Sequence, residues 1–295
     1  MSTGKRKADR SGWIVDPAVQ LLAADGFDLS KIPTGGKPGF TGSSKAGKQA
    51  LRAASEQLAD LQERLFAGRQ RAVLLVLQGM DTSGKGGIVA HVVGAVNPQG
   101  VKYVAFKPPT EAELRHDFLW RIRKQVPEPG IIGVFDRSHY EDVLAGSVRS
   151  LAPEDEIERR YGAINDFESE LVESGIRILK VMLHLGADEQ KSRLLARLDD
   201  PEKYWKYNPG DVDDRALWPR YQEAYQRAIE RTSTPEAPWY VVPADHKWYA
   251  RLAVQQLLLG VLEDFDLEWP PADFDVDAER ERLLSLSLAP TGTPR

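Results

Sequence analysis

The sequence predicts an α/β fold in which a parallel β-sheet carries helices on both of its faces. Two observations support this. The first is that short apolar runs, such as residues 72–78 (AVLLVLQ), are continuous, as in strands buried on both sides. The second is that these runs alternate with longer segments whose apolar residues recur at helical spacing. The chain has 295 residues, 42% of them hydrophobic, which suffices for one large domain of this kind.

The expected elements follow one another along the chain. Strands are expected at residues 72–78, 101–106, 131–135, 176–185 and 239–242. Helices are expected at residues 48–66, 86–96, 110–125, 153–174 and 246–263. Thr110 and Glu113 form the pattern of a capping box at the start of the third helix. Strands that alternate with helices are typical of βαβ units, and therefore of a parallel sheet.

We expect three regions along the chain. Residues 1–45, rich in Gly, Ser, Lys and Pro, are expected to form an extended or loosely packed N-terminal arm. Residues 46–265 are expected to form the α/β domain. Within it, residues 188–221 break the strand–helix rhythm with a charged, aromatic-rich helical insertion. Residues 266–295 are expected to form a C-terminal tail that wraps over the surface or frays.

Composition excludes several classes of protein. The chain has no cysteine, so it has no disulfide and no thiolate chemistry. No apolar run approaches the ~20 residues that span a bilayer, and no apolar stretch of a secretory signal follows the basic N-terminus. The net charge of −5 argues against a general nucleic-acid binder, which is usually basic. We therefore expect a soluble cytoplasmic protein with no nucleic-acid or membrane partner.

Residues 79–87 (GMDTSGKGG) have the pattern of a phosphate-binding loop between a strand and a helix. Gly79, Gly84 and Lys85 match the G-x-x-x-x-G-K motif, in which backbone N–H groups surround a phosphate and the lysine faces its oxygens. A plain glycine-rich turn is the alternative. The other loop residues expected to contact phosphate or nucleotide are Met80, Thr82, Ser83, Gly86 and Gly87.

One part of the motif is missing, because Gly86 stands where such loops carry the Ser or Thr that holds Mg²⁺. Asp81 inside the loop would repel phosphate unless a cation lay between them, so it is a candidate ligand for Mg²⁺ or Mn²⁺. Asp136 ends the third strand in a Walker-B arrangement, and the carboxyl ends of parallel strands share one edge of the sheet. We expect Asp81 and Asp136 to share the metal. The alternative for Asp81 is a turn or helix-capping role, and the alternative for Asp136 is the N-cap of a helix that starts near Ser138.

Charged side chains complete the expected site. Arg137 follows Asp136 and offers a planar fork for phosphate, while Glu141 lies one helical turn further on. The insertion is interpreted as a mobile lid that brings arginine over the transferred group and excludes water. A solvated amphipathic hairpin is the alternative. Four cationic residues of the insertion are expected to contact phosphate: Arg193, Arg197, Lys203 and Arg215.

Three stretches, GMDTSGKGG, FDRSHYEDVL and RLLARLDDPEKYWKY, together resemble the second family of polyphosphate kinases. The resemblance implies a P-loop kinase fold similar to thymidylate kinase, with a helical lid, and a homo-oligomer. It also implies Mg²⁺-dependent, reversible transfer of the terminal phosphoryl group of inorganic polyphosphate to AMP or ADP, with GMP and GDP as further acceptors. By motif position, Asp81 and Asp136 would bind metal, Lys85 and Arg137 would grip phosphates, and Arg197 would be the lid arginine.

Two other hypotheses stay open. An ATP-dependent nucleoside monophosphate kinase would share the fold and the lid, although such enzymes usually keep the hydroxyl that Gly86 lacks. A non-catalytic P-loop module would bind nucleotide or polyphosphate as a sensor. The SHYEDVL ending is similar to family members that accept AMP as well as ADP. That subgroup often has Asn in place of Asp136 and Asp in place of Gly87, so the acceptor range stays open.

Overall fold

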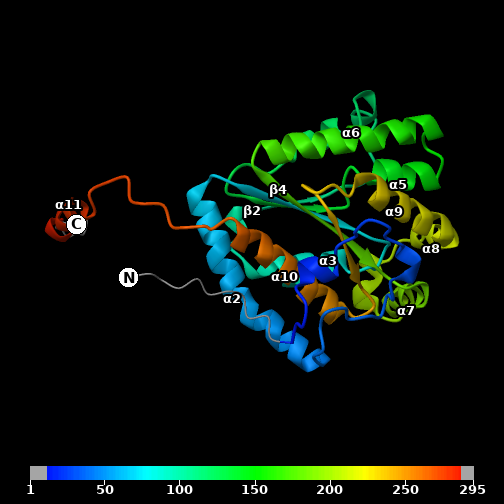
Figure 1. Ribbon diagram of the computed structural model, residues 1–295, viewed down its shortest axis with the longest axis horizontal. Helices are drawn as coiled ribbons and strands as arrows, with labels where there is room; N and C mark the ends of the chain where they lie inside the picture. Colours follow the sequence, from blue (N-terminus) through cyan, green and yellow to red (C-terminus); the bar gives the residue numbers. More distant parts are fainter. Residues whose placement is uncertain (1–11, 287–295) are drawn as a thin grey trace, which may run out of the picture.

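The computed structural model describes residues 12–286, and its centre is a five-stranded sheet with all neighbouring strands parallel (Figure 1). The strands are β1 (Ala72–Gln78), β2 (Val101–Ala105), β3 (Ile132–Asp136), β4 (Ile176–His184) and β5 (Trp239–Pro243). They lie side by side in the order β2-β3-β1-β4-β5. All five predicted strands are confirmed, each within one residue of its expected ends.

The helices surround this sheet. They are α1 (Pro17–Gln20), α2 (Ser44–Gly68), α3 (Lys85–His91), α4 (Trp120–Arg123), α5 (Glu141–Val148), α6 (Glu154–Glu173), α7 (Ala187–Leu198), α8 (Gly210–Ala216), α9 (Trp218–Thr232), α10 (Lys247–Asp264) and α11 (Val276–Ser285). Short 3-10 turns are η1 (Leu29–Lys31), η2 (Val93–Ala95), η3 (Pro98–Gly100), η4 (Glu113–Arg115) and η5 (Pro201–Lys206). The helical insertion between β4 and β5 is confirmed, and within the described chain no helix is long and apolar enough to cross a membrane.

The single helix predicted over residues 110–125 is wrong. Its capping box does form, because Glu113 Oε2 accepts from the Thr110 N–H (2.7 Å) and Thr110 Oγ1 accepts from the Glu113 N–H (3.3 Å). These bonds lie just before the turn η4, whose N-cap residue Ala112 forms no side-chain cap. Asp117 Oδ1 then accepts from the N–H of Leu119 (2.9 Å), the residue that precedes the separate turn α4. Local side-chain-to-backbone bonds have therefore replaced a continuous helix.

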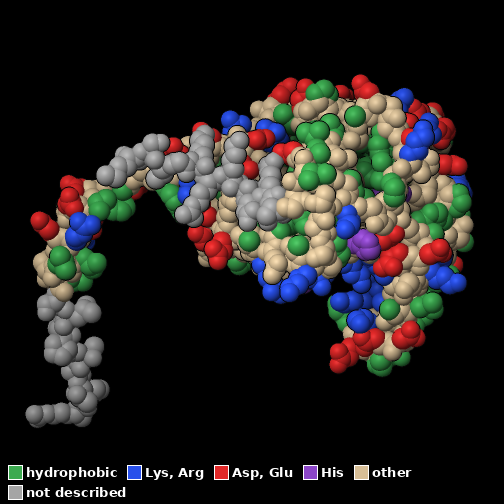
Figure 2. All heavy atoms as spheres, turned by 60° about the horizontal axis from the view of Figure 1, so that its bottom comes forward, with side chains coloured by type: hydrophobic (Ala, Val, Ile, Leu, Met, Phe, Trp, Pro, Cys, Tyr) green, Lys and Arg blue, Asp and Glu red, His purple; other side chains and the backbone are tan. Residues whose placement is uncertain are grey.

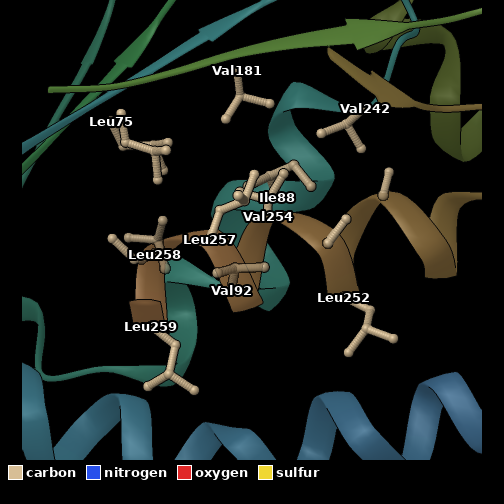
Figure 3. Packing of buried hydrophobic residues seen from close by; sticks show 14 of the residues in the cluster. Leu75, Ile88, Val92, Val181, Val242, Leu252, Val254, Leu257, Leu258 and Leu259 are labelled. Carbon is tan, nitrogen blue, oxygen red and sulfur yellow. The ribbon is translucent and has the colours of Figure 1, made fainter. Parts of the chain in front are cut away.

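Successive residues of β1 point to opposite faces of the sheet, which explains its unbroken apolar sequence. Leu75 and Leu77 enter the core beneath α2, α3 and α10, whereas Leu74 and Val76 enter the core beneath α5, α6 and α9. Figure 1 shows these two helical layers on either side of the sheet, and Figure 3 shows the first core, where α3 and α10 meet the strands. The sheet is therefore rigidly sandwiched, and its carboxyl edge is held firmly in place.

The segment before α2 packs more closely than expected. Leu21, Leu29 and Phe40 are only 3%, 3% and 4% exposed. An antiparallel bridge joins Leu22 to Tyr240 and covers the outer edge of β5, which would otherwise present unpaired backbone groups. These residues fasten the segment to the domain, while most of residues 12–45 lies outside regular elements, and the expected extended or loosely packed arm stays a prediction. Residues 1–11 of the expected arm and 287–295 of the expected tail lie outside the described residues, and the domain boundaries at 45 and 265 stay a prediction.

Candidate active site

The predicted phosphate loop connects β1 to α3 at the carboxyl edge of the sheet. Gly79 (φ 150°) and Gly84 (φ 113°) take backbone conformations that other residues rarely adopt. A Cβ on Gly79 would also lie 2.8 Å from the carbonyl oxygen of Leu183. Both glycines are therefore required by the path of the chain. By contrast, a Cβ on Gly86 would meet no atom within 4 Å, so the missing hydroxyl is not excluded by space.

Lys85 lies beneath this loop and is 8% exposed. Its Nζ donates to the carbonyl oxygen of Gly79 (2.7 Å) and, at longer range, to that of Met80 (3.4 Å). An ammonium group has three N–H donors, so one is left for a phosphate oxygen. Lys85 thus shapes the loop and offers a positive charge inside it.

Asp81 and Arg137 form an ion pair across the edge of the sheet, with 2.5 Å between Oδ1 and Nη2. Burial opposes the charge of Asp81, but Lys85 and Arg137, and then Arg197, hold its pKa below the ordinary value. Arg137 itself takes a left-handed φ of 62°, and its backbone N–H donates to Leu77 (3.0 Å). The structure therefore brings Asp81, Lys85, Arg137 and Arg197 into one electrostatic cluster.

Asp136 and Glu141 border the same cluster. Asp136 ends β3 opposite Leu77 of β1, and its Oδ2 accepts a hydrogen bond from the Tyr103 hydroxyl (3.3 Å). Burial raises the pKa of Glu141, while the positive charges of Arg137 and Lys85 oppose this rise. The charge of Glu141 is therefore felt together with those of Lys85 and Asp81, and its contact with phosphate or nucleotide stays a prediction.

The Arg193 side chain lies against the backbone of the phosphate loop, not on the side of the loop where phosphate is expected. Nη1 donates to the carbonyl oxygens of Thr82 (2.8 Å) and Ser83 (3.3 Å), and Nη2 to those of Ala244 (2.7 Å) and Asp245 (2.8 Å). Nε donates to Glu189 (2.7 Å). All five N–H donors are then engaged. Arg193 therefore fixes the shape of the loop, and this geometry does not favour its predicted contact with phosphate.

Arg215 has a similar structural role. Its Nη1 donates to the carbonyl oxygen of Ala187 (2.5 Å) and to Gln190 Oε1 (3.2 Å). Gln190 in turn donates to the backbone oxygen of Asp81 (3.2 Å). Lys203 pairs with Asp200 (2.5 Å) and its side chain is 51% exposed, so it lies at the surface of the insertion. Contacts of Arg215 and Lys203 with phosphate stay predictions.

The insertion also brings an acidic residue that the sequence analysis did not single out. Asp211 of α8 is 5% exposed and pairs with Arg197 (3.4 Å), whose Nη1 also donates to the Lys206 carbonyl (2.8 Å). Burial, and next the charge of Asp81, raise the pKa of Asp211 to about 6. The sequence gives no reason to choose Asp211 among the many acidic residues of this segment. Its burial and its pairing with Arg197 become visible only in the folded chain.

Two cations of α10 were missed as well. A Cβ on Gly87 would lie 3.4 Å from Arg251 Nη2, so Arg251 flanks the start of α3. Burial, and next the charge of Arg193, lower the pKa of both Lys247 and Arg251. Within residues 12–286, neither side chain forms an ion pair. Figure 2 shows Lys and Arg side chains gathered at a notch in the lower surface of the molecule.

The carboxylates fit a divalent metal that arrives with its substrate. In the part of the chain that the structure describes, no three His, Cys, Asp or Glu side chains are placed to hold a metal alone. Mg²⁺ usually keeps several waters and binds through one or two carboxylates plus substrate phosphates. Asp81 and Asp136, from adjacent strand ends, provide two carboxylates of this kind. That both ligate one ion stays a prediction.

A parallel sheet, a phosphate loop with a buried lysine and acidic groups after two adjacent strands define a phosphotransferase of the P-loop kinase class. The profile of the family described as Polyphosphate kinase 2 (PPK2) matches residues 41–269. The chain therefore belongs to the polyphosphate kinase 2 family, and the resemblance seen in its three motifs is confirmed.

Named relatives and a solved structure support this family membership. The chain is 46% identical over 244 residues to the AMP/ADP-polyphosphate phosphotransferase of Meiothermus ruber, covering 83% of this chain and 91% of the relative. It is 41% identical over 271 residues to the ADP-polyphosphate phosphotransferase of Rhodopseudomonas palustris, covering 88% and 92%. The crystal structure of polyphosphate kinase 2 from Arthrobacter aurescens TC1 is 56% identical with a TM-score of 0.91, covering 93% of this chain and 98% of that one. The predicted P-loop kinase fold is confirmed.

Proposed function

We propose that this chain transfers the terminal phosphoryl group of inorganic polyphosphate to AMP or ADP, with GMP and GDP as further acceptors, in a reversible reaction that requires Mg²⁺ or Mn²⁺. The observation that carries this proposal is the pairing of Asp81 with Arg137 above a loop in which Gly86 lacks the usual hydroxyl. The carboxylate supplies, from within the loop, the oxygen ligand that the missing hydroxyl would have given. The names of the two relatives support the choice of donor and acceptors.

The reaction forms a bond between an acceptor phosphate oxygen and the terminal phosphorus of the donor, and the bridging P–O bond to the shortened chain breaks. The attacking oxygen is already anionic, so no strong base is needed and the residues act by position and charge. The free N–H of Lys85 and the remaining N–H groups of Arg137 take up charge on the transferred group, and Arg197 approaches from the insertion. A metal held by Asp81 and Asp136 would neutralise phosphate charge.

The unpaired cations of α10 support a long anionic donor. Arg251 lies beside the start of α3, and neither Lys247 nor Arg251 forms an ion pair among residues 12–286, whereas a nucleotide donor would also need a surface for its base. A row of cations suits a chain of identical phosphate groups, because each unit presents the same charge. Nucleotide acceptors are cytoplasmic metabolites, in agreement with the predicted location.

A matrix of donors and acceptors tests the proposal. Polyphosphate or ATP is supplied with AMP, ADP, GMP or GDP, with Mg²⁺, with Mn²⁺ or with a chelator, and the nucleotides are then separated. We expect phosphorylation of AMP and ADP with polyphosphate as the only donor, and none with the chelator. Phosphorylation with ATP alone would instead establish a nucleoside monophosphate kinase, and tight binding of polyphosphate without turnover would establish a sensor.

A further inference from the structure

A segment at the C-terminal end of the described chain lies away from the rest of the molecule. We call residues 270–286, which include α11, the C-terminal arm. Every residue of the arm is exposed, including the apolar Phe274 (60%), Leu283 (72%) and Leu284 (81%). Figures 1 and 2 show α11 separated from the body. A ten-residue helix is marginal in water on its own, so the apolar side chains of α11 call for a partner surface.

The arm is acidic and lies beyond the end of the family match at residue 269. It carries five carboxylates and two guanidinium groups, a net charge of −3. An acidic helix is repelled by anionic lipid and by polyphosphate alike, since interfacial helices are usually rich in Lys and Arg. The partner surface is therefore expected to be a protein surface that combines apolar and basic side chains.

The chain itself presents such a surface at the start of α2. Lys45, Lys48 and Arg52 follow one another at spacings of three and four, so they lie on one face of the helix. All three are exposed, and within residues 12–286 none of them pairs with a carboxylate. The exposed Ile14 (72%) and Val19 (69%) belong to the neighbouring N-terminal segment. We call these five residues the receiving face.

The N-terminal segment and α2 are held together in this region by aromatic contacts. The rings of Trp13 and Phe40 meet edge to face at 5.4 Å, and Phe40 also packs against Trp248 (5.7 Å). Trp248 lies close against Gly47 of α2, where a Cβ would come within 2.3 Å of its ring. These contacts fasten the N-terminal segment, which carries Ile14, to the first turns of α2, which carry the basic part of the receiving face.

The arm begins at the opposite end of α2 from the receiving face. Arg64 lies over the ring of Trp269 (5.9 Å) and donates to the carbonyl oxygen of Leu267 (3.4 Å), so the chain stays attached to α2 up to this point. Arg64 and Arg52 are twelve residues apart, about 18 Å along the helix axis. A two-fold axis near the middle of α2 would therefore place residue 270 of one copy, where its arm begins, beside the receiving face of the other copy. The same axis would place the second arm beside the receiving face of the first copy.

We propose that the C-terminal arm docks on the receiving face of a second copy of this chain, so that two arms are exchanged in a symmetric dimer. The apolar residues of the arm then lie against Ile14 and Val19, and its carboxylates lie against Lys45, Lys48 and Arg52. The contact is reciprocal because both copies present the same arm and the same face. It does not depend on the proposed phosphoryl transfer, and its test does not require activity.

Light scattering on the full chain after size-exclusion chromatography tests the proposal. We expect the unaltered chain to have at least twice the mass of one chain, and deletion of residues 270–295 to halve that mass. Reversing the face by Lys45→Glu, Lys48→Glu and Arg52→Glu should halve it too, as should reversing the arm by Asp277→Lys, Glu279→Lys and Glu281→Lys. Combining both reversals should restore the larger mass.

A matched control reverses three exposed carboxylates on α6, which lies on the other side of the sheet from α2 (Figure 1). The changes Asp155→Lys, Asp166→Lys and Glu173→Lys alter the net charge by the same amount and in the same direction as the reversal of the arm, and should leave the mass unchanged. A monomeric full chain, or an arm deletion that keeps the larger mass, would overturn the proposal. If deletion of the arm halves the mass but the changes at Lys45, Lys48 and Arg52 leave it unaltered, the receiving face is not the docking site.

Discussion

Arg137 and Asp81 are joined by an ion pair of 2.5 Å although 56 residues separate them in the sequence. Arg137 follows the end of β3 and Asp81 lies in the loop after β1, so the pair joins two neighbouring strand ends. It aims a planar cation at the place where phosphate is expected. The pair also limits the freedom of the acidic side chain that we propose as a metal ligand.

Replacing Arg137 by Lys should preserve the charge but lose the fork that contacts Asp81 and phosphate together. We expect kcat for ADP phosphorylation by polyphosphate to fall about 10²-fold or more, since an arginine on a transferred phosphoryl group can contribute 10³–10⁵ in other phosphotransferases. Urea unfolding should change by less than ~1 kcal/mol, as is usual for partly exposed pairs. A variant with unaltered kcat would remove Arg137 from the mechanism.

Removing either the loop lysine or the strand-end acid should abolish transfer. Lys85→Ala loses the only ammonium bound to the carbonyls of Gly79 and Met80 among the described residues, and Asp136→Ala loses one proposed metal ligand. We expect no phosphorylation of ADP by polyphosphate in either variant, measured by nucleotide separation at saturating Mg²⁺. Circular dichroism melting serves as the control for folding. Turnover close to normal in a folded variant would reject the assigned role.

The buried pair of Lys180 and Glu168 is expected to be the most sensitive point for stability. The two charges lie 2.6 Å apart and are 0% and 2% exposed, and Lys180 also donates to the Thr232 carbonyl (2.6 Å). Burial lowers the pKa of Lys180, while Lys180 in turn keeps the pKa of Glu168 below its usual value despite burial. Lys180→Met leaves a buried carboxylate without its partner, which typically costs about 3–5 kcal/mol.

The matched double variant distinguishes a lost ion pair from a general packing defect. Adding Glu168→Gln to Lys180→Met removes the uncompensated charge, so part of the lost free energy of unfolding should return in urea titrations. Equal destabilisation in the single and double variants would contradict this explanation.

Acid stability should depend on Glu156 in the first turn of α6. Hydrogen bonds from Arg159 and Arg160 lower the pKa of Glu156 to about 2. Because the folded state prefers the charged form, its stabilising effect is complete above about pH 4.5 and is lost as the pH falls toward 2. Glu156→Gln should therefore cost about 1 kcal/mol at pH 7, allowing for solvent screening, and nothing near pH 2. Urea titrations at both pH values check this, and an equal cost at both would contradict it.

The strands could be predicted closely because each is a continuous apolar run between turn residues, and both faces of the sheet are covered. Residues 110–125 could not, because the choice between one helix and two turns depends on Asp117 and on Arg121. Asp117 accepts from the N–H of Leu119 just before the second turn, and Arg121 donates to the carbonyl oxygen of Lys107 (2.7 Å). Neither contact leaves a periodic pattern in the sequence.

The shared location of Asp81, Lys85, Asp136 and Arg137 at one edge of the sheet could be predicted because each belongs to a local motif after a strand, while their roles stay predictions. The contacts of Arg193 with Thr82 and Ser83 span more than a hundred residues, so spacing alone suggested a phosphate ligand instead. Asp211, Lys247 and Arg251 were missed for the same reason, because common charged residues gain a role only through what lies beside them.

The bonds of Arg193 also hold part of the insertion against the phosphate loop. They fasten the middle of α7 both to the phosphate loop and to the chain after β5, so this half of the insertion is fixed with the rest of the enzyme. Arg215 of α8 in turn donates to Ala187 and Gln190 of α7, and Arg149 of α5 pairs with Asp214 of α8. Motion of the insertion as a lid stays a prediction: it would have to release these contacts of α8, whereas the bonds of Arg193 would keep the phosphate loop in the same shape before and after substrate arrives.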